Sequence, residues 1–207
     1  MRVVFISDTH NKHQQVQVPQ GDMLIHAGDV SGRGTKTEIE NFLNWFSTQP
    51  HQYKIFIAGN HDFFIENHPE KFNEILPKNI IYLQDMMVEI EGRKIYGSPW
   101  TPNFMDWAFM KNTGNEIAQE WQKIPEGIDI LITHGPAFGT LDKIYTGLSV
   151  GCVELASFLP KIKPKYFLFG HIHEAYGMKN KEGTTYCNGA VLNERYQLQN
   201  PPIIFEI

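Results

Sequence analysis

The chain has few cysteines and no long basic run. Its 207 residues include only Cys152 and Cys187, and no run of basic residues exceeds two. Two cysteines at this spacing fit neither a disulfide framework nor a cysteine-rich metal site, so we expect a cytoplasmic protein. The formal net charge of -5 gives no general attraction for nucleic acid, which is therefore a disfavoured partner but not an excluded one.

Long apolar runs are also missing. No stretch approaches the roughly 18 consecutive apolar residues of a membrane span, so no membrane association is expected. The opening MRVVFISD is a short apolar run that meets Asp8, which predicts a first strand and not a signal peptide. The composition, 42% hydrophobic and 20% charged, is typical of a globular protein. With no repeat or linker, we predict one domain, residues 1–207.

Short apolar runs rich in β-branched residues recur along the whole chain. They are RVVFIS, MLIHA, KIFIA, IIYL, RKIYG, DILIT, KYFLFG, TTYC and PIIFEI. Runs that are apolar at successive positions are typical of strands buried on both faces. Helical patterns lie between several of them.

The clearest helical pattern follows Thr35 or Thr37, either of which is expected to cap a helix. Its apolar residues recur at the spacing of one helix face: Ile39, Phe42, Leu43 and Phe46. Further helices are expected near residues 69–76, 115–123 and 151–162. The alternation predicts an α/β domain with more than one sheet.

Polar side chains follow five of the predicted strands. They are Asp8 and His10, Asp29, Asn60 with His61 and Asp62, His134, and finally His171 and His173. In open α/β sheets the ligand crevice lies beyond the carboxyl ends of the strands, so these side chains are expected to converge. Taken singly, each also fits an ordinary role as a helix cap, a turn residue or a loop histidine.

The chemistry of this set indicates metal. Imidazole, carboxylate and amide oxygen together suit manganese, iron, zinc or cobalt. Asp8 and His10 are two apart, as are His171 and His173, and on an extended chain each pair would share a face. Seven of these residues are possible ligands, which is too many for one ion and predicts two divalent transition-metal ions: Asp8, His10, Asp29, Asn60, His134, His171 and His173.

These blocks resemble the calcineurin-like metallophosphoesterase superfamily, whose pattern is D-x-H, G-D, G-N-H-D/E, a strand-end H, and G-H-x-H. All five blocks occur here in order, from Asp8 to His173. The stretches SPWTPNFMDWAF, LITHGPAFGTLD and FGHIHEAYG look like its small single-domain metallophosphodiesterase group. The resemblance implies a β-sandwich of two mixed sheets flanked by helices, a four-layer α/β fold.

The resemblance also implies a role for each residue. One ion would be bound by Asp8, His10 and His173, the other by Asn60, His134 and His171, with Asp29 bridging them. A bridging hydroxide would be the nucleophile. His61 would face the substrate as general acid, Asp62 would orient it, and Asn60 would also contact the substrate.

The expected activity is metal-dependent hydrolysis of phosphate esters, with diesters favoured over monoesters and a small phosphate ester or nucleotide as substrate. Two alternatives stay open. One is a nuclease. The other is a non-catalytic, metal-binding interaction scaffold of the same fold.

Several residues outside the five blocks have two interpretations. Arg33 could reach a phosphate oxygen or be solvated. The residues Trp100, Trp107 and Phe109 could wall the substrate pocket or pack in the core. Glu174 could support a metal-binding histidine. We expect His26 to be packed inside its strand, and His13, His51 and His68 to be solvated.

Overall fold

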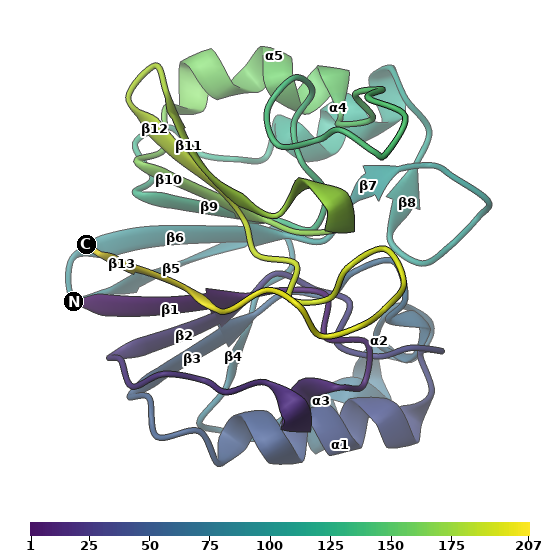
Figure 1. Cartoon of the computed structure of the whole chain (residues 1–207), viewed down its shortest axis with the longest axis vertical. Helices are drawn as coiled ribbons and strands as arrows, with labels where there is room; N and C mark the ends of the chain where they lie inside the picture. The colour runs from purple at the N-terminus through teal and green to yellow at the C-terminus, as the bar shows by residue number, and fades with distance from the viewer.

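The computed structural model describes all 207 residues. Two sheets pack face to face, with α1, α2 and α3 covering one and α4 and α5 covering the other (Figure 1). This arrangement confirms the predicted α/β sandwich of two mixed sheets flanked by helices. No helix is long and apolar enough to cross a bilayer.

The first sheet has the order β13-β1-β2-β3-β4, and only β13 runs antiparallel to its neighbour. Its strands are β1 (Arg2–Ile6), β2 (Met23–His26), β3 (Tyr53–Phe56), β4 (Ile81–Tyr82) and β13 (Ile203–Glu206). Parallel pairing brings the carboxyl ends of β1, β2 and β3 to one edge of this sheet.

The second sheet has the order β11-β12-β10-β9-β6-β5, with four parallel inner strands and an antiparallel strand at each edge. Its strands are β5 (Met86–Ile90), β6 (Arg93–Ser98), β9 (Ile130–Thr133), β10 (Tyr166–Phe169), β11 (Gly177–Lys181) and β12 (Thr184–Asn188). A separate short pair comprises β7 (Thr101–Pro102) and β8 (Met110–Lys111).

The helices are α1 (Lys36–Ser47), α2 (Phe63–Asn67), α3 (Pro69–Ile75), α4 (Asn115–Trp121) and α5 (Val153–Ile162), with 3₁₀ turns η1 (His13–Gln15) and η2 (His173–Ala175). Thr35 caps α1: its side chain accepts from the backbone N–H of Glu38, whose carboxylate accepts from Thr35 in return. This capping box fixes where the helix begins. Its predicted apolar face is buried against the first sheet.

Strand β1 shows why the apolar runs are continuous. Val3 and Phe5 point into the core between the sheets, whereas Val4 and Ile6 point toward the helices. Because successive side chains of a strand alternate between faces, both faces must be apolar. The strand is buried on both sides, as predicted.

Some expectations were wrong. His13 and His51, expected to be solvated, are each 1% exposed. His13 packs against Phe42 and Trp45, and His51 bonds through Nε2 to the carbonyl oxygen of Pro19. The elements β5, β7, β8, β11 and α2 were not anticipated, because they are short or polar. His26 is buried and His68 is exposed, as expected.

Candidate metal centre

The predicted polar residues follow the ends of strands in both sheets. Asp8 and His10 follow β1, Asp29 follows β2, Asn60 and His61 follow β3, His134 follows β9, and His171 and His173 follow β10. The structure brings all of them together where the two sheets meet. Their acidic and imidazole side chains form three overlapping groups, and Asn60 contacts one of these groups through His134. The predicted convergence is therefore present.

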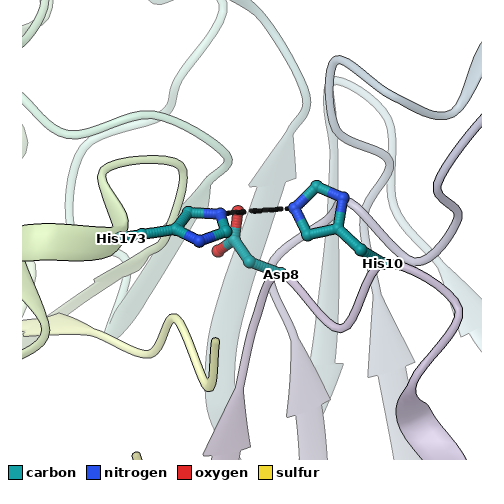
Figure 2. A group of neighbouring side chains, drawn as sticks. All are labelled: Asp8, His10 and His173. Atoms are coloured by element: carbon teal, nitrogen blue, oxygen red, sulfur yellow. Dashed lines mark hydrogen bonds and ion pairs between the residues drawn. The ribbon is translucent and has the colours of Figure 1, made fainter. Parts of the chain in front are cut away.

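Asp8, His10 and His173 form one group. The Nε2 atoms of the two histidines are 3.3 Å apart. The Oδ1 atom of Asp8 lies 3.6 Å from Nε2 of His173 and 4.0 Å from Nε2 of His10. Figure 2 shows the two rings pointing toward each other beside the Asp8 carboxylate. Residues 163 positions apart thus aim their donor atoms at one point.

Asn60, His134 and His171 form the neighbouring group. Nε2 of His134 lies 2.8 Å from Oδ1 of Asn60, and the rings of His134 and His171 have centroids 5.1 Å apart. The donor atoms of Asp29, His134 and His171 lie within 4.8 Å of one another.

Asp29 stands between these groups. Its Oδ2 atom is 3.5 Å from Nε2 of His10, whereas its Oδ1 atom is 3.4 Å from Nε2 of His134. Each carboxylate oxygen therefore faces a different imidazole. A carboxylate in this position can contact two cations at once.

Backbone carbonyls fix the orientation of two of the rings. Nδ1 of His134 lies 2.8 Å from the Ala27 oxygen, and Nδ1 of His173 lies 2.9 Å from the Asn193 oxygen. A carbonyl can only accept, so Nδ1 of each ring carries hydrogen. Nε2 is then the ring nitrogen that binds a proton or a metal ion, which is the arrangement of metal-binding histidines.

The charges of the site call for a cation. Burial would raise the pKa of Asp8, but its interaction with His173 holds that pKa below the usual range. Burial would lower the pKa of His134 and of His173, yet Asp29 and Asp8 respectively raise each to about 9. Burial lowers the pKa of His10 and His171 to about 4. The two buried carboxylates are therefore stable only beside positive charge. A divalent metal ion bound by the converging Nε2 atoms would supply that charge.

The backbone at the site is strained, and this corrects one expectation. Asp8, His10, Asp29 and His171 have φ of 56°, 39°, 55° and 67°, so the D-x-H and H-x-H segments are not extended. Such conformations cost of order 1–3 kcal/mol each and cluster at functional sites. Convergence comes from these left-handed residues and not from two-residue alternation along a strand.

Two glycines let the carboxylates approach the backbone. A Cβ atom on Gly59 would overlap Oδ1 of Asp29, and one on Gly170 would overlap Oδ2 of Asp8. The backbone N–H of His171 then donates to both oxygens of Asp8, each at 3.0 Å. Any larger residue would push these carboxylates out of place.

His61 lies beside the two groups. Its Nδ1 atom is 2.9 Å from the Gly32 carbonyl oxygen, its Nε2 atom is 3.9 Å from Oδ2 of Asp29, and its backbone N–H donates to Oδ1 of Asp29 at 2.8 Å. The ring lines a cavity, and Nε2 is the ring nitrogen that the Gly32 carbonyl leaves free.

Asp62 does not contact the ring of His61, contrary to the expected pairing. It is fully buried, and its carboxylate accepts from Ser31 and from the backbone N–H groups of Val30 and Gly59. Burial and the neighbouring Asp29 raise the pKa of Asp62 to about 6. Asp62 therefore joins the segments that carry Asp29 and Asn60, and the Gly32 carbonyl orients His61.

The cavity over the histidines has a volume of about 280 Å³. It is lined by the metal-binding residue types His10, Asp29, Asn60, His171 and His173, by His61, and by Phe104, Trp107, Met110 and Tyr196. Glu174 and Glu194 also line it, but no lysine or arginine does. The site is therefore a small hollow that combines candidate metal ligands, apolar side chains and two further carboxylates.

The comparisons with known proteins agree with this geometry. Residues 1–175 match the sequence family described as Calcineurin-like phosphoesterase. This chain belongs to that family. It is 40% identical over 230 residues to "Metallophosphoesterase domain-containing protein 1" of Homo sapiens and of Mus musculus, covering 100% of this chain and 71% of each relative.

A solved structure, TT1561 of Thermus thermophilus, has a TM-score of 0.63 at 12% identity, covering 91% of this chain and 88% of that one. At this identity the likeness concerns the fold alone. It supports the same sandwich architecture for this phosphoesterase.

Other residues of the phosphoesterase divide between cavity and core. Trp107 lines the cavity, whereas Trp100 and Phe109 pack against the core. Arg33 is exposed and does not line the cavity, so its contact with phosphate stays a prediction. Glu174 accepts from the backbone N–H of Tyr145 and from no histidine.

Sequence reasoning missed several side chains at this site. Phe104, Met110, Glu194 and Tyr196 line the cavity, and Asn193 orients His173. Asn193, Glu194 and Tyr196 lie beyond residue 175, where the family match ends. No local motif marks them, since they reach the site through the fold.

Proposed function

We propose that this phosphoesterase hydrolyses phosphodiesters with two bound divalent transition-metal ions, manganese, iron, zinc or cobalt. The observation that supports two ions is the position of Asp29, whose oxygens face His10 and His134 separately. Asp8, His10 and His173 would hold one ion, Asn60, His134 and His171 the other, and Asp29 both. Two such ions supply a nucleophile derived from water at neutral pH and neutralise phosphoryl charge.

His61 is the residue that handles the proton of the leaving group. Its Nδ1–H is occupied by the Gly32 carbonyl, so Nε2 is the atom that exchanges a proton in the cavity. Proton donation to a leaving alkoxide is worth about 10²–10⁴-fold in general acid catalysis. Asp62 contributes by holding the Val30–Ser31 segment next to Gly59.

The charge of the cavity favours diesters over monoesters. A phosphodiester carries one negative charge at neutral pH, whereas a monoester carries nearly two. Glu174 and Glu194 line the cavity without any lysine or arginine to offset them. Two divalent ions bound by Asp8 and Asp29 would leave a formal charge of about +2, which Glu174 and Glu194 would offset, so little positive charge is left for the second charge of a monoester. The two free, buried cysteines support a cytoplasmic setting for this activity.

The test combines metal analysis with two substrates that share a leaving group. The protein is stripped with chelator, reloaded with each metal, and assayed with bis-p-nitrophenyl phosphate and p-nitrophenyl phosphate. We expect two ions per chain and faster turnover of the diester. Two bound ions without turnover of either ester would indicate the non-catalytic scaffold. Cleavage of single-stranded DNA far above the small diester would indicate the nuclease.

A further inference from the structure

Two aromatic side chains contact different histidines of the cavity. The ring of Trp107 lies 4.2 Å from that of His61, centroid to centroid. The ring of Tyr196 lies 4.8 Å from His10 and 5.2 Å from His173, and farther, 6.5 Å, from His61. His61 and His10 are 4.5 Å apart between them. The cavity thus has an aromatic surface beside the proton-handling histidine and a second one beside the Asp8–His10–His173 group.

Hydrogen bonds within and around its loop hold the backbone of Tyr196 in place. Its φ of 57° lies in the left-handed region, which is costly for a bulky residue. Nζ of Lys12 donates to the Tyr196 carbonyl, and the Tyr196 N–H donates to the Asn193 carbonyl at 2.8 Å. That carbonyl is the one that also orients His173. The surrounding contacts therefore stabilise a strained tyrosine at the cavity wall, which is typical of a functional position.

The two aromatic surfaces correspond to the two substituents of a diester. The leaving oxygen must lie near Nε2 of His61 to receive its proton, so the leaving group lies next to Trp107. The substituent that stays on phosphorus then has the Tyr196 end of the cavity. A monoester has a leaving group but no second substituent.

We propose that Trp107 packs against the leaving group and Tyr196 against the retained substituent, so that the cavity selects diesters with a flat or apolar group on each side. This assignment rests on the proposed function and makes Tyr196 a specificity-determining residue. Aromatic contacts of this kind correspond to roughly three- to tenfold in affinity.

The experiment compares Tyr196→Ala, Tyr196→Phe and Trp107→Ala in manganese-loaded protein. Tyr196→Ala should lower kcat/KM for bis-p-nitrophenyl phosphate roughly three- to tenfold. It should leave kcat/KM for p-nitrophenyl phosphate within about twofold of wild type, because this monoester has the same leaving group and no retained substituent. Tyr196→Phe keeps the ring and should behave as wild type. Trp107→Ala should lower kcat/KM for both substrates by similar factors.

A binding measurement gives a readout independent of turnover. Calorimetry with manganese-loaded protein should show Tyr196→Ala weakening diphenyl phosphate roughly three- to tenfold while leaving inorganic phosphate unchanged. Tyr145→Ala is the matched control, because that tyrosine is 85% exposed and does not line the cavity. Melting temperatures of the metal-free variants establish that they fold.

Equal losses on the diester and the monoester, or no loss on either, would overturn the assignment of Tyr196. A wild-type protein inert toward both esters would instead overturn the proposed function. In that case the calorimetric comparison of diphenyl phosphate with inorganic phosphate decides the aromatic assignment by itself.

Discussion

We expect Asp62→Asn to destabilise the whole site although Asp62 does not contact the ring of His61. Its Oδ1 atom accepts from the backbone N–H of Ser31 at 3.0 Å and from the Ser31 hydroxyl at 2.7 Å. Its Oδ2 atom accepts from the N–H of Gly59 at 2.8 Å and of Val30 at 3.3 Å. An asparagine has one oxygen and one NH₂ group. With NH₂ in place of Oδ2 two backbone N–H groups would face another donor, whereas with NH₂ in place of Oδ1 only the Ser31 N–H would, because the Ser31 hydroxyl can also accept.

The magnitude follows from the one or two backbone N–H groups left without an acceptor. A buried donor without a partner costs about 1–3 kcal/mol. Removing a buried negative charge next to Asp29 offsets part of this cost. We therefore expect a net loss of about 2–4 kcal/mol in the free energy of unfolding. For a chain of this size that corresponds to a fall in melting temperature of roughly 5–15 °C.

Stability is measured by thermal unfolding of metal-free protein. Turnover of esters with good and poor leaving groups is then measured on metal-loaded protein. Glu89→Gln makes the same carboxylate-to-amide change at an exposed position and should leave the melting temperature within about 2 °C. Because displaced segments move Asp29 and Asn60, Asp62→Asn should slow both ester classes alike. An unchanged melting temperature with loss confined to poor leaving groups would refute this reasoning, since that pattern belongs to a direct partner of His61.

Three further results are expected. His61→Ala should slow esters with poor leaving groups by about 10²–10⁴-fold and p-nitrophenyl esters less, and equal losses on both would remove it from the acid role. Asp29→Asn should lower bound metal from two ions to one or none by metal analysis, and full occupancy would contradict a shared ligand. Burial lowers the pKa of His13 to about 4 in the folded chain. As the pH falls below 6.5, the unfolded chain therefore binds a proton at this histidine before the folded chain does. His13 alone should contribute a loss of about 1–2 kcal/mol between pH 6.5 and 4, so the fall in stability should be smaller by that amount in His13→Phe and unchanged in His68→Gln, at an exposed position.

The positions of the metal-binding residue types followed from the sequence because each comes directly after a buried strand. The run before Asp8 and the run before Asn60 are apolar at successive positions, which predicts interior parallel strands and hence a shared edge. The pattern of apolar runs does not predict the backbone conformation of the residues that follow each strand. Asp8 and His171 have positive φ, and the strain is stabilised by contacts between segments that no single stretch reveals.

Asp62 illustrates the limit of reading roles from adjacency. Next to His61 in sequence, it was expected to orient that ring. In the structure its carboxylate turns away toward Ser31 and Gly59, and a backbone carbonyl takes its place. Backbone acceptors have no sequence signal, and the contact between His61 and the Gly32 carbonyl depends on the folded path of residues 30–32.

The Tyr196 loop reaches the site because one segment crosses between the sheets. After β12 the chain leaves the second sheet, and Ser7 pairs with Ala190 at the end of β1. The N–H of Ser7 donates to Gly189, and the N–H of Val191 donates back to Ser7. This crossing brings Asn193 to His173 and Tyr196 to His10, although nearly the whole chain separates Tyr196 from His10. The specificity proposed for Tyr196 would therefore depend on long-range pairing, whereas the positions of the candidate metal-binding residues follow from where individual strands end.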